Sequence, residues 1–142
     1  MGHITASAFL INSDASKFLL MHHKKINLWL QPGGHCDGEV DVLNTAIKEA
    51  REESGIEHIK PVNNQLYDID IHPIPSYKNV LAHEHFDVRF LLQTVSSDEL
   101  VKNDESLELR WIDFNTSIPD SFNLAPSIYR MIEKYKLYSQ IT

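Results

Sequence analysis

Residues 33–56, GGHCDGEVDVLNTAIKEAREESGI, decide the fold of this chain. The segment opens on a glycine pair, which predicts a tight turn. A helix is expected over about residues 41–54, with Asp41 as its N-cap and Gly55 just past its end. The apolar stripe that can anchor this helix to a core consists of Leu43, Ile47 and Ala50.

Three acidic side chains lie close together on this helix: Glu49, Glu52 and Glu53, at positions i, i+3 and i+4. With a step of about 100° per residue, they fall within about a third of the helix circumference. Their repulsion costs roughly 0.2–0.5 kcal/mol per pair. A hard divalent cation removes that cost, because carboxylate oxygens are the ligands that Mg²⁺ and Mn²⁺ prefer. The spacing therefore indicates a metal platform, and the alternative interpretation is a solvated acidic helix face.

The order of glycine turn, acidic helix and closing glycine resembles the Nudix box of the Nudix (MutT-like) hydrolases. That box is a Gly, five residues, a Glu, seven residues, and then Arg-Glu-apolar-any-Glu-Glu-any-Gly-apolar. Residues 49–56, EAREESGI, match its second half without a gap. On this resemblance the chain is identified as a member of the Nudix hydrolase family, with its box at about 33–56.

Two positions depart from the box pattern. Counted back from the paired acids, the box glycine is Gly34, so the box glutamate falls on Val40 and Glu39 stands one place early. The box arginine is replaced by Lys48, which pairs with an acid only as a point charge, without the fork of a guanidinium. The arrangement over residues 37–41 resembles a Nudix subgroup with a His and an Asp-Gly in that loop.

The resemblance implies a fold, a domain and a cofactor. The fold class is α/β, a Nudix-type α/β/α sandwich with a mixed sheet and a loop-helix-loop catalytic motif. Because the resemblance spans essentially the whole chain, we expect a single domain over residues 1–142. The implied cofactor is Mg²⁺ or Mn²⁺. Its implied ligands are the Gly33 carbonyl and the carboxylates of Glu49, Glu52 and Glu53.

A further acid is expected in the loop before Trp111. In Nudix hydrolases, a loop acid upstream of such a tryptophan often completes the metal site or acts as base. Glu105, six residues before Trp111, matches that place, and Glu108 is the second choice. Either this loop acid or one of the helix acids would orient or deprotonate the attacking water, and a solvated loop acid is the alternative. The expected catalytic residues are thus Glu49, Glu52, Glu53 and Glu105.

The run HEHFDVRF, residues 83–90, forms a second polar pattern. On a strand, the period of two sends every second side chain of this run, from His83 onward, to one face. That face is too polar for a core, so we expect it to line a cleft or face water, joined by His72. The side chains expected to contact substrate are His35, His83, His85, Asp87 and Arg89. A zinc-type site built on His-x-His-x-Asp is left open, as is a solvated strand face.

The remaining pattern places strands around the acidic helix and a second helix at the end of the chain. Alternating or short apolar runs predict strands over 5–11, 17–22, 28–31, 66–74, 84–94 and 109–112. The closing helix is expected over 124–139. Its core-facing side chains would be Ile128, Met131, Ile132 and Tyr135.

Composition indicates a globular protein of the cytoplasm. The 142 residues are 42% hydrophobic and 23% charged, and no apolar run approaches the roughly 20 residues of a membrane helix. We expect no membrane partner and no signal peptide. The single cysteine, Cys36, excludes an internal disulfide and suits a reducing compartment. The net charge of −7 argues against a nucleic-acid polymer as partner but not against a single nucleotide.

The expected activity is metal-dependent hydrolysis of a diphosphate bond in a nucleoside diphosphate linked to a group X, or in a related nucleotide. One alternative is a catalytically silent Nudix-fold sensor that binds a nucleotide or other ligand. Another is an isoprenoid-diphosphate isomerase, which would need a cysteine and glutamate pair, with Cys36 the only cysteine available. The identity of X stays open, because one fold supports many substrates. Homodimers are common among the proteins that this chain resembles, so a homodimer is also left open.

Overall fold

The computed structural model describes residues 2–74, 76, 79 and 81–141. Its strands and helices follow the predicted order, with ends shifted by a few residues. The elements are β1 Gly2–Ile11, β2 Lys17–His23, β3 Trp29–Leu30, β4 Gly33–His35, α1 Val42–Ser54, β5 Ile59–Pro61, β6 Asp68–Ile74, β7 His83–Thr94, β8 Ser106–Asp113, a 3₁₀ turn Asp120–Phe122 and α2 Pro126–Ile141. The short strands β4 and β5 were not predicted. The tight turn expected at Gly33 and Gly34 is wrong, because both residues pair with β1 as part of β4, and the positive φ angles of this loop lie at Asp37 and Gly38.

The strands form one mixed sheet. Its main path runs β3-β2-β1-β7-β5, and β4, β6 and β8 pair with β1, β7 and β2 respectively. Strands β1 and β7 are parallel along their whole paired length, from Gly2 opposite Glu84 to Ile11 opposite Gln93, whereas the other pairs are antiparallel. The parallel pair therefore brings the N-terminal strand beside the predicted histidine-rich strand.

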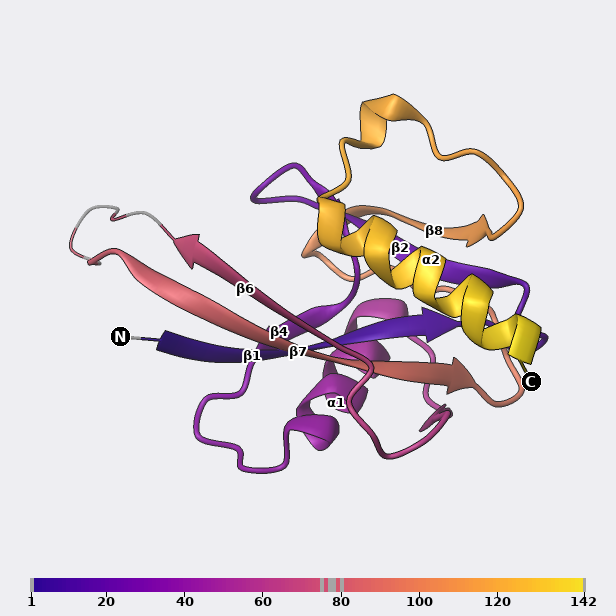
Figure 1. The fold of residues 1–142 in the computed structure, drawn as a ribbon, viewed down its shortest axis with the longest axis horizontal. Coiled ribbons are helices and arrows are strands. Elements are labelled where there is room, and N and C mark those ends of the chain that lie inside the picture. The colour runs from indigo at the N-terminus through magenta and orange to yellow at the C-terminus, as the bar shows by residue number, and fades with distance from the viewer. Residues whose placement is uncertain (1, 75, 77–78, 80, 142) are drawn as a thin grey trace.

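Helices α1 and α2 cover opposite faces of this sheet (Figure 1). Side chains alternate along β1, so Ala6, Ala8 and Leu10 pack toward α1 while Phe9 and Ile11 pack toward α2. The predicted core face of the closing helix is confirmed, because Ile128, Met131, Ile132 and Tyr135 are all buried. Together with the mixed sheet, the two helix layers confirm the predicted α/β/α sandwich.

Helix α1 is held at both ends. The Asp41 side chain accepts a hydrogen bond from the backbone N–H of Asn44 at 3.1 Å, which confirms the predicted N-cap. Gly55 ends the helix in the left-handed region, with φ 75°, and its N–H donates to the Arg51 carbonyl at 2.9 Å. A Cβ at Gly55 would lie 2.5 Å from Val101 Cβ, so the loop between β7 and β8 packs directly on this cap.

Neither helix in the described part of the chain combines the length and the apolar character that crossing a membrane requires.

Replacing Gly55 by Ala should destabilise the protein more than replacing Gly38 by Ala. Both glycines have positive φ, 75° and 86°, which costs an alanine about 1–2 kcal/mol. A Cβ at Gly38 meets nothing within 4 Å, whereas one at Gly55 collides with Val101. We expect the loss in free energy of unfolding for G55A to exceed that for G38A by about 1 kcal/mol or more. Urea unfolding of both variants measures the difference, and equal losses would contradict the proposed packing.

Candidate functional site

The three helix acids differ in their exposure to solvent. Glu53 is buried, with 4% of its surface exposed, whereas Glu49 is half-buried and Glu52 is exposed. All three come from the second half of α1, near its Gly55 cap. The helix thus directs one carboxyl group into the protein and leaves the other two nearer to solvent.

The carboxyl group of Glu53 lies against strand β4. The backbone N–H of Gly33 donates a hydrogen bond to Glu53 Oε2 at 3.3 Å. Burial, followed by the charge of Glu49 and the hydrogen bond shared with it, raises the pKa of Glu53 to about 9. In the absence of a cation, this side chain is therefore protonated near neutral pH.

Glu49 occupies the space that a side chain on Gly34 would fill. A Cβ at Gly34 would lie 2.8 Å from both Cδ and Oε1 of Glu49. Burial is the largest cause of the raised pKa of Glu49, and the charges of Glu52 and Glu105 add to it. Only a glycine at this position lets the carboxylate lie so close to the strand.

The structure brings Glu105 to the helix acids. Its charge raises the pKa of both Glu49 and Glu53. Asn103 connects this turn to α1, because its side-chain nitrogen donates to the Glu52 carbonyl at 3.2 Å. The Asn103 side-chain oxygen in turn accepts from the backbone N–H of Glu105 at 2.9 Å. A loop far from α1 in the sequence is thus tied to the end of that helix.

Glu108, the second choice for the loop acid, is paired elsewhere. Its Oε2 accepts hydrogen bonds from Arg110 Nη2 at 2.6 Å and from Arg110 Nε at 2.8 Å. Arg110 also lies over the rings of Trp29 and Phe122, 5.3 Å from each ring centre. The charge of Glu108 is therefore compensated by Arg110. Glu105 is instead the loop acid whose charge raises the pKa of the α1 acids.

The carboxylate cluster, defined as Glu49, Glu52, Glu53 and Glu105, fits a hard divalent cation. Its donors are all oxygens, the ligand type that Mg²⁺ and Mn²⁺ prefer. Burial is the largest cause of the raised pKa of both Glu49 and Glu53, and the charges of neighbouring acids add to it, so a cation beside them would stabilise their ionised forms. The Gly33 N–H donates to Glu53 at the same edge, and the part of the Gly33 carbonyl as a ligand stays a prediction.

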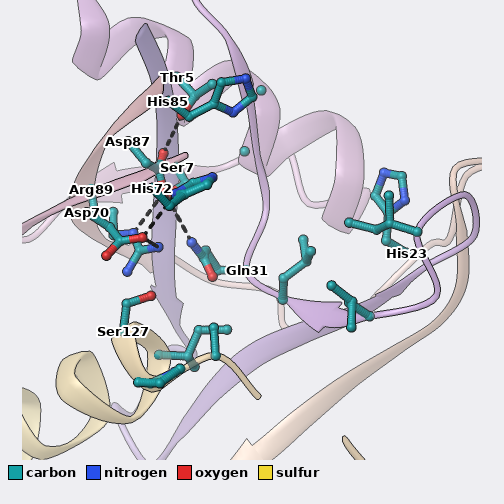
Figure 2. A pocket seen from close by; sticks show the side chains of 18 of the residues that line it. Thr5, Ser7, His23, Gln31, Asp70, His72, His85, Asp87, Arg89 and Ser127 are labelled. Carbon is teal, nitrogen blue, oxygen red and sulfur yellow. Dashed lines mark hydrogen bonds and ion pairs between the residues drawn. The ribbon is translucent and has the colours of Figure 1, made fainter. Parts of the chain in front are cut away.

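A cavity of about 750 Å³ opens on the other side of β4. Because side chains alternate along a strand, Gly33 and His35 face the cavity, as do their partners on β1, while Gly34 faces α1. The start of α2 forms the opposite wall, where Ser127 lies (Figure 2). Neither Gly33 nor Gly34 has a side chain, so at these two positions only the backbone of β4 lies between the cavity and the carboxylate cluster.

Asp87 and Arg89 line this cavity but are already paired with each other. Both are buried, with 5% and 4% of their surfaces exposed, and Arg89 Nε donates to Asp87 Oδ2 at 2.8 Å. Asp87 also accepts from the hydroxyls of Thr5 and Ser7, each at 2.9 Å. The predicted polar face of β7 does line a cleft. Its two inner members have their charges compensated within the protein, so their predicted contact with substrate stays a prediction.

Three more charged residues belong to this region and escaped the sequence analysis: Asp68 and Asp70 of β6 and Arg130 of α2. Arg130 Nη2 lies 2.7 Å from Asp68 Oδ2, and Arg89 Nη1 lies 3.3 Å from the same atom. The alternation Asp-x-Asp-x-His over residues 68–72 could have identified the β6 acids, since it has the period of the polar face of β7. Arg130 has no comparable signal, because the pattern of α2 is dominated by its apolar face.

Gln31 offers the cavity an unpaired acceptor. Only 7% of its surface is exposed, and its amide nitrogen donates to Ser7 Oγ at 3.2 Å. Its Oε1 is buried without a hydrogen-bond partner among the described residues. A buried acceptor left unpaired costs free energy.

His85 lines the cavity near Thr5 (Figure 2), and the centroids of four other histidine rings lie within 5.9 Å of its own. Burial, followed by the positive charges of the surrounding imidazoles, lowers the pKa of His85. The sequence analysis identified four of the group and missed His3, although the alternation His-x-Thr-x-Ser at the start of β1 could have revealed it. The group consists of His3, His35, His72, His83 and His85.

Comparison with known proteins gives a family match and a curated relative. A family model described as a NUDIX domain matches residues 1–135. A protein of Lactococcus lactis, named a probable DHNTP pyrophosphohydrolase, is 34% identical over 92 residues, which are 63% of this chain and 53% of that protein. The chain therefore spans about half the length of this curated relative.

Solved structures share the whole fold at low sequence identity. An Ap4A hydrolase of C. elegans in a binary complex has a TM-score of 0.68 at 16% identity over 99% of both chains. A MutT NUDIX hydrolase of Burkholderia pseudomallei has a TM-score of 0.69 at 19% identity, over 94% of this chain and 98% of that one. A NUDIX-family hydrolase of Clostridium perfringens has a TM-score of 0.65 at 25% identity, over 96% and 97%. The predicted fold is confirmed by these likenesses.

Replacing Glu53 by Gln should stabilise the metal-free protein at alkaline pH. The pKa of Glu53 is raised from 4.5 to about 9, so the folded protein holds a proton that the unfolded chain releases. The resulting stability is fully present below about pH 4.5 and is lost as the pH rises toward 9. Since Gln stays neutral, the variant's Tm should exceed that of the parent by about 3 °C or more near pH 8.5, and by much less near pH 4.5.

Thermal unfolding in EDTA at both pH values measures this difference. Glu57→Gln is the matched control, because Glu57 is an exposed glutamate just beyond α1 and its replacement should leave the Tm within about 1 °C. A difference between E53Q and the parent that does not grow with pH would contradict the burial of the Glu53 carboxyl group.

Proposed function

Because the chain belongs to the NUDIX domain family, with residues 1–135 matched, we propose that it is a metal-dependent pyrophosphohydrolase. Its substrate would be a nucleoside diphosphate linked to a group X, or a related nucleotide, and its cation Mg²⁺ or Mn²⁺. The single observation that carries the proposal is the buried carboxyl group of Glu53 beside Glu49 and the Gly33 backbone. Burial makes ionisation of this carboxyl group costly, and a cation beside it would offset that cost.

Each member of the carboxylate cluster would have a part in this reaction. Glu49, Glu52 and Glu53 would hold the cation together with the Gly33 carbonyl. A divalent cation in such a site neutralises the charge of a diphosphate and lowers the pKa of water. Glu105 reaches the cluster from a turn of its own. This position suits it to accept a proton from the attacking water and to orient that water toward phosphorus.

The substrate would extend across β4 at Gly33 and Gly34, which have no side chains. Its diphosphate would meet the cluster beside Gly33 and Gly34, and its base or other group X would enter the cavity of about 750 Å³. That volume is within the roughly 300–1,000 Å³ typical of small-molecule sites. His35 and His85, at the cavity wall, would contact the phosphates or X.

Cys36 argues against the isomerase alternative. It is buried, with 9% of its surface exposed, and burial raises the pKa of its thiol. A catalytic cysteine needs the opposite, an accessible thiol with a lowered pKa. Hydrolysis therefore accounts for the acidic site better than a reaction that depends on this cysteine.

The setting of the enzyme is proposed from the same family. We propose one domain over residues 1–142, action in the cytoplasm on a small molecule, and no nucleic-acid or membrane partner. A homodimer would be compatible with this reaction. The net charge of −7 suits a substrate whose phosphates meet a cation rather than lysines.

A substrate panel tests the proposed reaction. The protein is incubated with nucleoside diphosphate derivatives, nucleoside triphosphates, DHNTP and Ap4A, with Mg²⁺, Mn²⁺ or EDTA. We expect release of pyrophosphate, phosphate or a nucleoside monophosphate from at least one class, abolished by EDTA. Glu53→Gln should lower the rate by more than about a hundredfold, because it removes a ligand of the cation. Glu57→Gln, the matched control, should leave the rate within about twofold.

Two outcomes would contradict the proposal. Full activity of E53Q would show that the carboxylate cluster is not the metal site. Tight nucleotide binding without turnover across the panel would instead favour the catalytically silent sensor.

A further inference from the structure

The group of five histidines is a cluster of metal-ligating side chains, and the proposed hydrolysis gives a part only to His35 and His85, as contacts of the substrate. It lies on the α2 side of the sheet, where β1, β4, β6 and β7 meet. His85 is central, because it is opposite His3 in the parallel β1–β7 pair and opposite His72 in the β6–β7 pair. His83 shares its face two residues earlier on β7, and His35 completes the group from β4.

We propose that His3, His83 and His85 form a second metal site, for a borderline divalent cation such as Zn²⁺. Their ring centroids are 4.4 Å apart for His3 and His83, 5.1 Å for His83 and His85, and 5.9 Å for His3 and His85. One nitrogen from each ring lies within 4.8 Å of the other two. Zn–N bonds of about 2.0–2.1 Å place two tetrahedral ligands about 3.4 Å apart. Small side-chain rotations therefore bring all three nitrogens to a common ion.

The imidazoles of His83 and His72 are oriented by hydrogen bonds at Nδ1, as is common for histidines that bind a metal through Nε2. Nδ1 of His83 lies 3.0 Å from the Leu81 carbonyl, which can only accept. Nδ1 of His83 is therefore the donor, and Nε2 keeps its lone pair. His72 repeats the arrangement, since its Nδ1 lies 3.1 Å from Asp70 Oδ2. In many metal-ligating histidines, a carbonyl or carboxylate accepts a hydrogen bond from the ring nitrogen that does not bind the metal. This hydrogen bond fixes the tautomer and the ring orientation.

The exposure of the three ligands also fits a binding site. His3, His83 and His85 are half-buried, so the site is accessible to ions yet held by the strands around it. His72, with its ring 5.4 Å from that of His85, and His35, at 5.2 Å, are within reach as a fourth ligand. Water or a phosphate oxygen could fill the same position.

Ligand chemistry separates this site from the carboxylate cluster. Imidazole nitrogens select Zn²⁺ and other late transition metals, whereas Mg²⁺ prefers oxygen donors. The two sites also lie on opposite sides of the sheet, since β1 directs Thr5 and Ser7 toward the histidine side and Ala6 toward α1. His85 lines the cavity (Figure 2), so a cation held there would border the space proposed for the substrate.

Cobalt binding tests the site, because Co²⁺ takes similar ligands to Zn²⁺ and its visible absorption reports them. Full-length protein without an affinity tag is titrated with Co²⁺ in an excess of Mg²⁺. We expect one Co²⁺ per chain with nitrogen-ligand absorption bands, displaced by Zn²⁺. The double variant H83A/H85A should weaken binding by more than about a hundredfold. His58→Ala is the matched control, since His58 is an exposed histidine outside the group, and it should bind as the parent does.

Further variants keep the result interpretable. Glu53→Gln should leave Co²⁺ binding unchanged, so failure of this proposal and failure of the proposed hydrolysis can be told apart. If H83A/H85A unfolds, the single variants His3→Ala and His83→Gln replace it, each checked by far-UV circular dichroism. No Co²⁺ binding, binding retained without these histidines, or binding lost in E53Q would each overturn the histidine site.

Discussion

The close approach of α1 to the bare backbone of β4 is the constraint on which the site depends. A Cβ at Gly33 would lie 2.5 Å from Ser7 Cβ, and one at Gly34 would lie 2.8 Å from Glu49 Cδ. With neither side chain present, β4 fits between β1 and the helix acids, and its Gly33 N–H reaches Glu53. The same two glycines leave the far side of the strand open to the cavity. The absence of side chains at Gly33 and Gly34 thus allows the carboxylate cluster and the cavity to approach β4 from its two sides.

The carboxylate cluster is held against its own repulsion by packing elsewhere on α1. Ala46 and Ala50 are fully buried beneath the sheet, and Gly55 fixes the end of the helix against Val101. These contacts place Glu53 in a setting where burial and Glu49 raise its pKa to about 9. A bound cation would remove the repulsion between these acids. Because the packing of α1 holds the acids together, it would increase their affinity for that cation. The buried Asp87–Arg89 pair differs, because its charges are compensated within the protein.

Local patterns predicted the elements well, and non-local contacts account for what was missed. The N-cap at Asp41, the extent of α1 and the buried face of α2 follow from short-range rules. The alternation at the start of β1 could have identified His3 as a polar-face residue, but its approach to His85 depends on the parallel β1–β7 register, which no local pattern contains. The burial of Arg89 likewise depends on acids from β6, a separate strand. Glu105 could be placed by its distance from Trp111 in the sequence, but its link to α1 through Asn103 is a tertiary contact.

Anomalous scattering from crystals soaked in Mn²⁺ tests the central claim most directly, because it locates the cation without reference to any substrate. The account predicts a peak on the α1 side of β4, about 2.0–2.4 Å from carboxylate oxygens of Glu49 and Glu53. A matched soak of Glu53→Gln crystals should lose it. Manganese found only among the histidines, or a peak unchanged in the Glu53→Gln crystals, would contradict the assignment of the carboxylate cluster as the metal site of this protein.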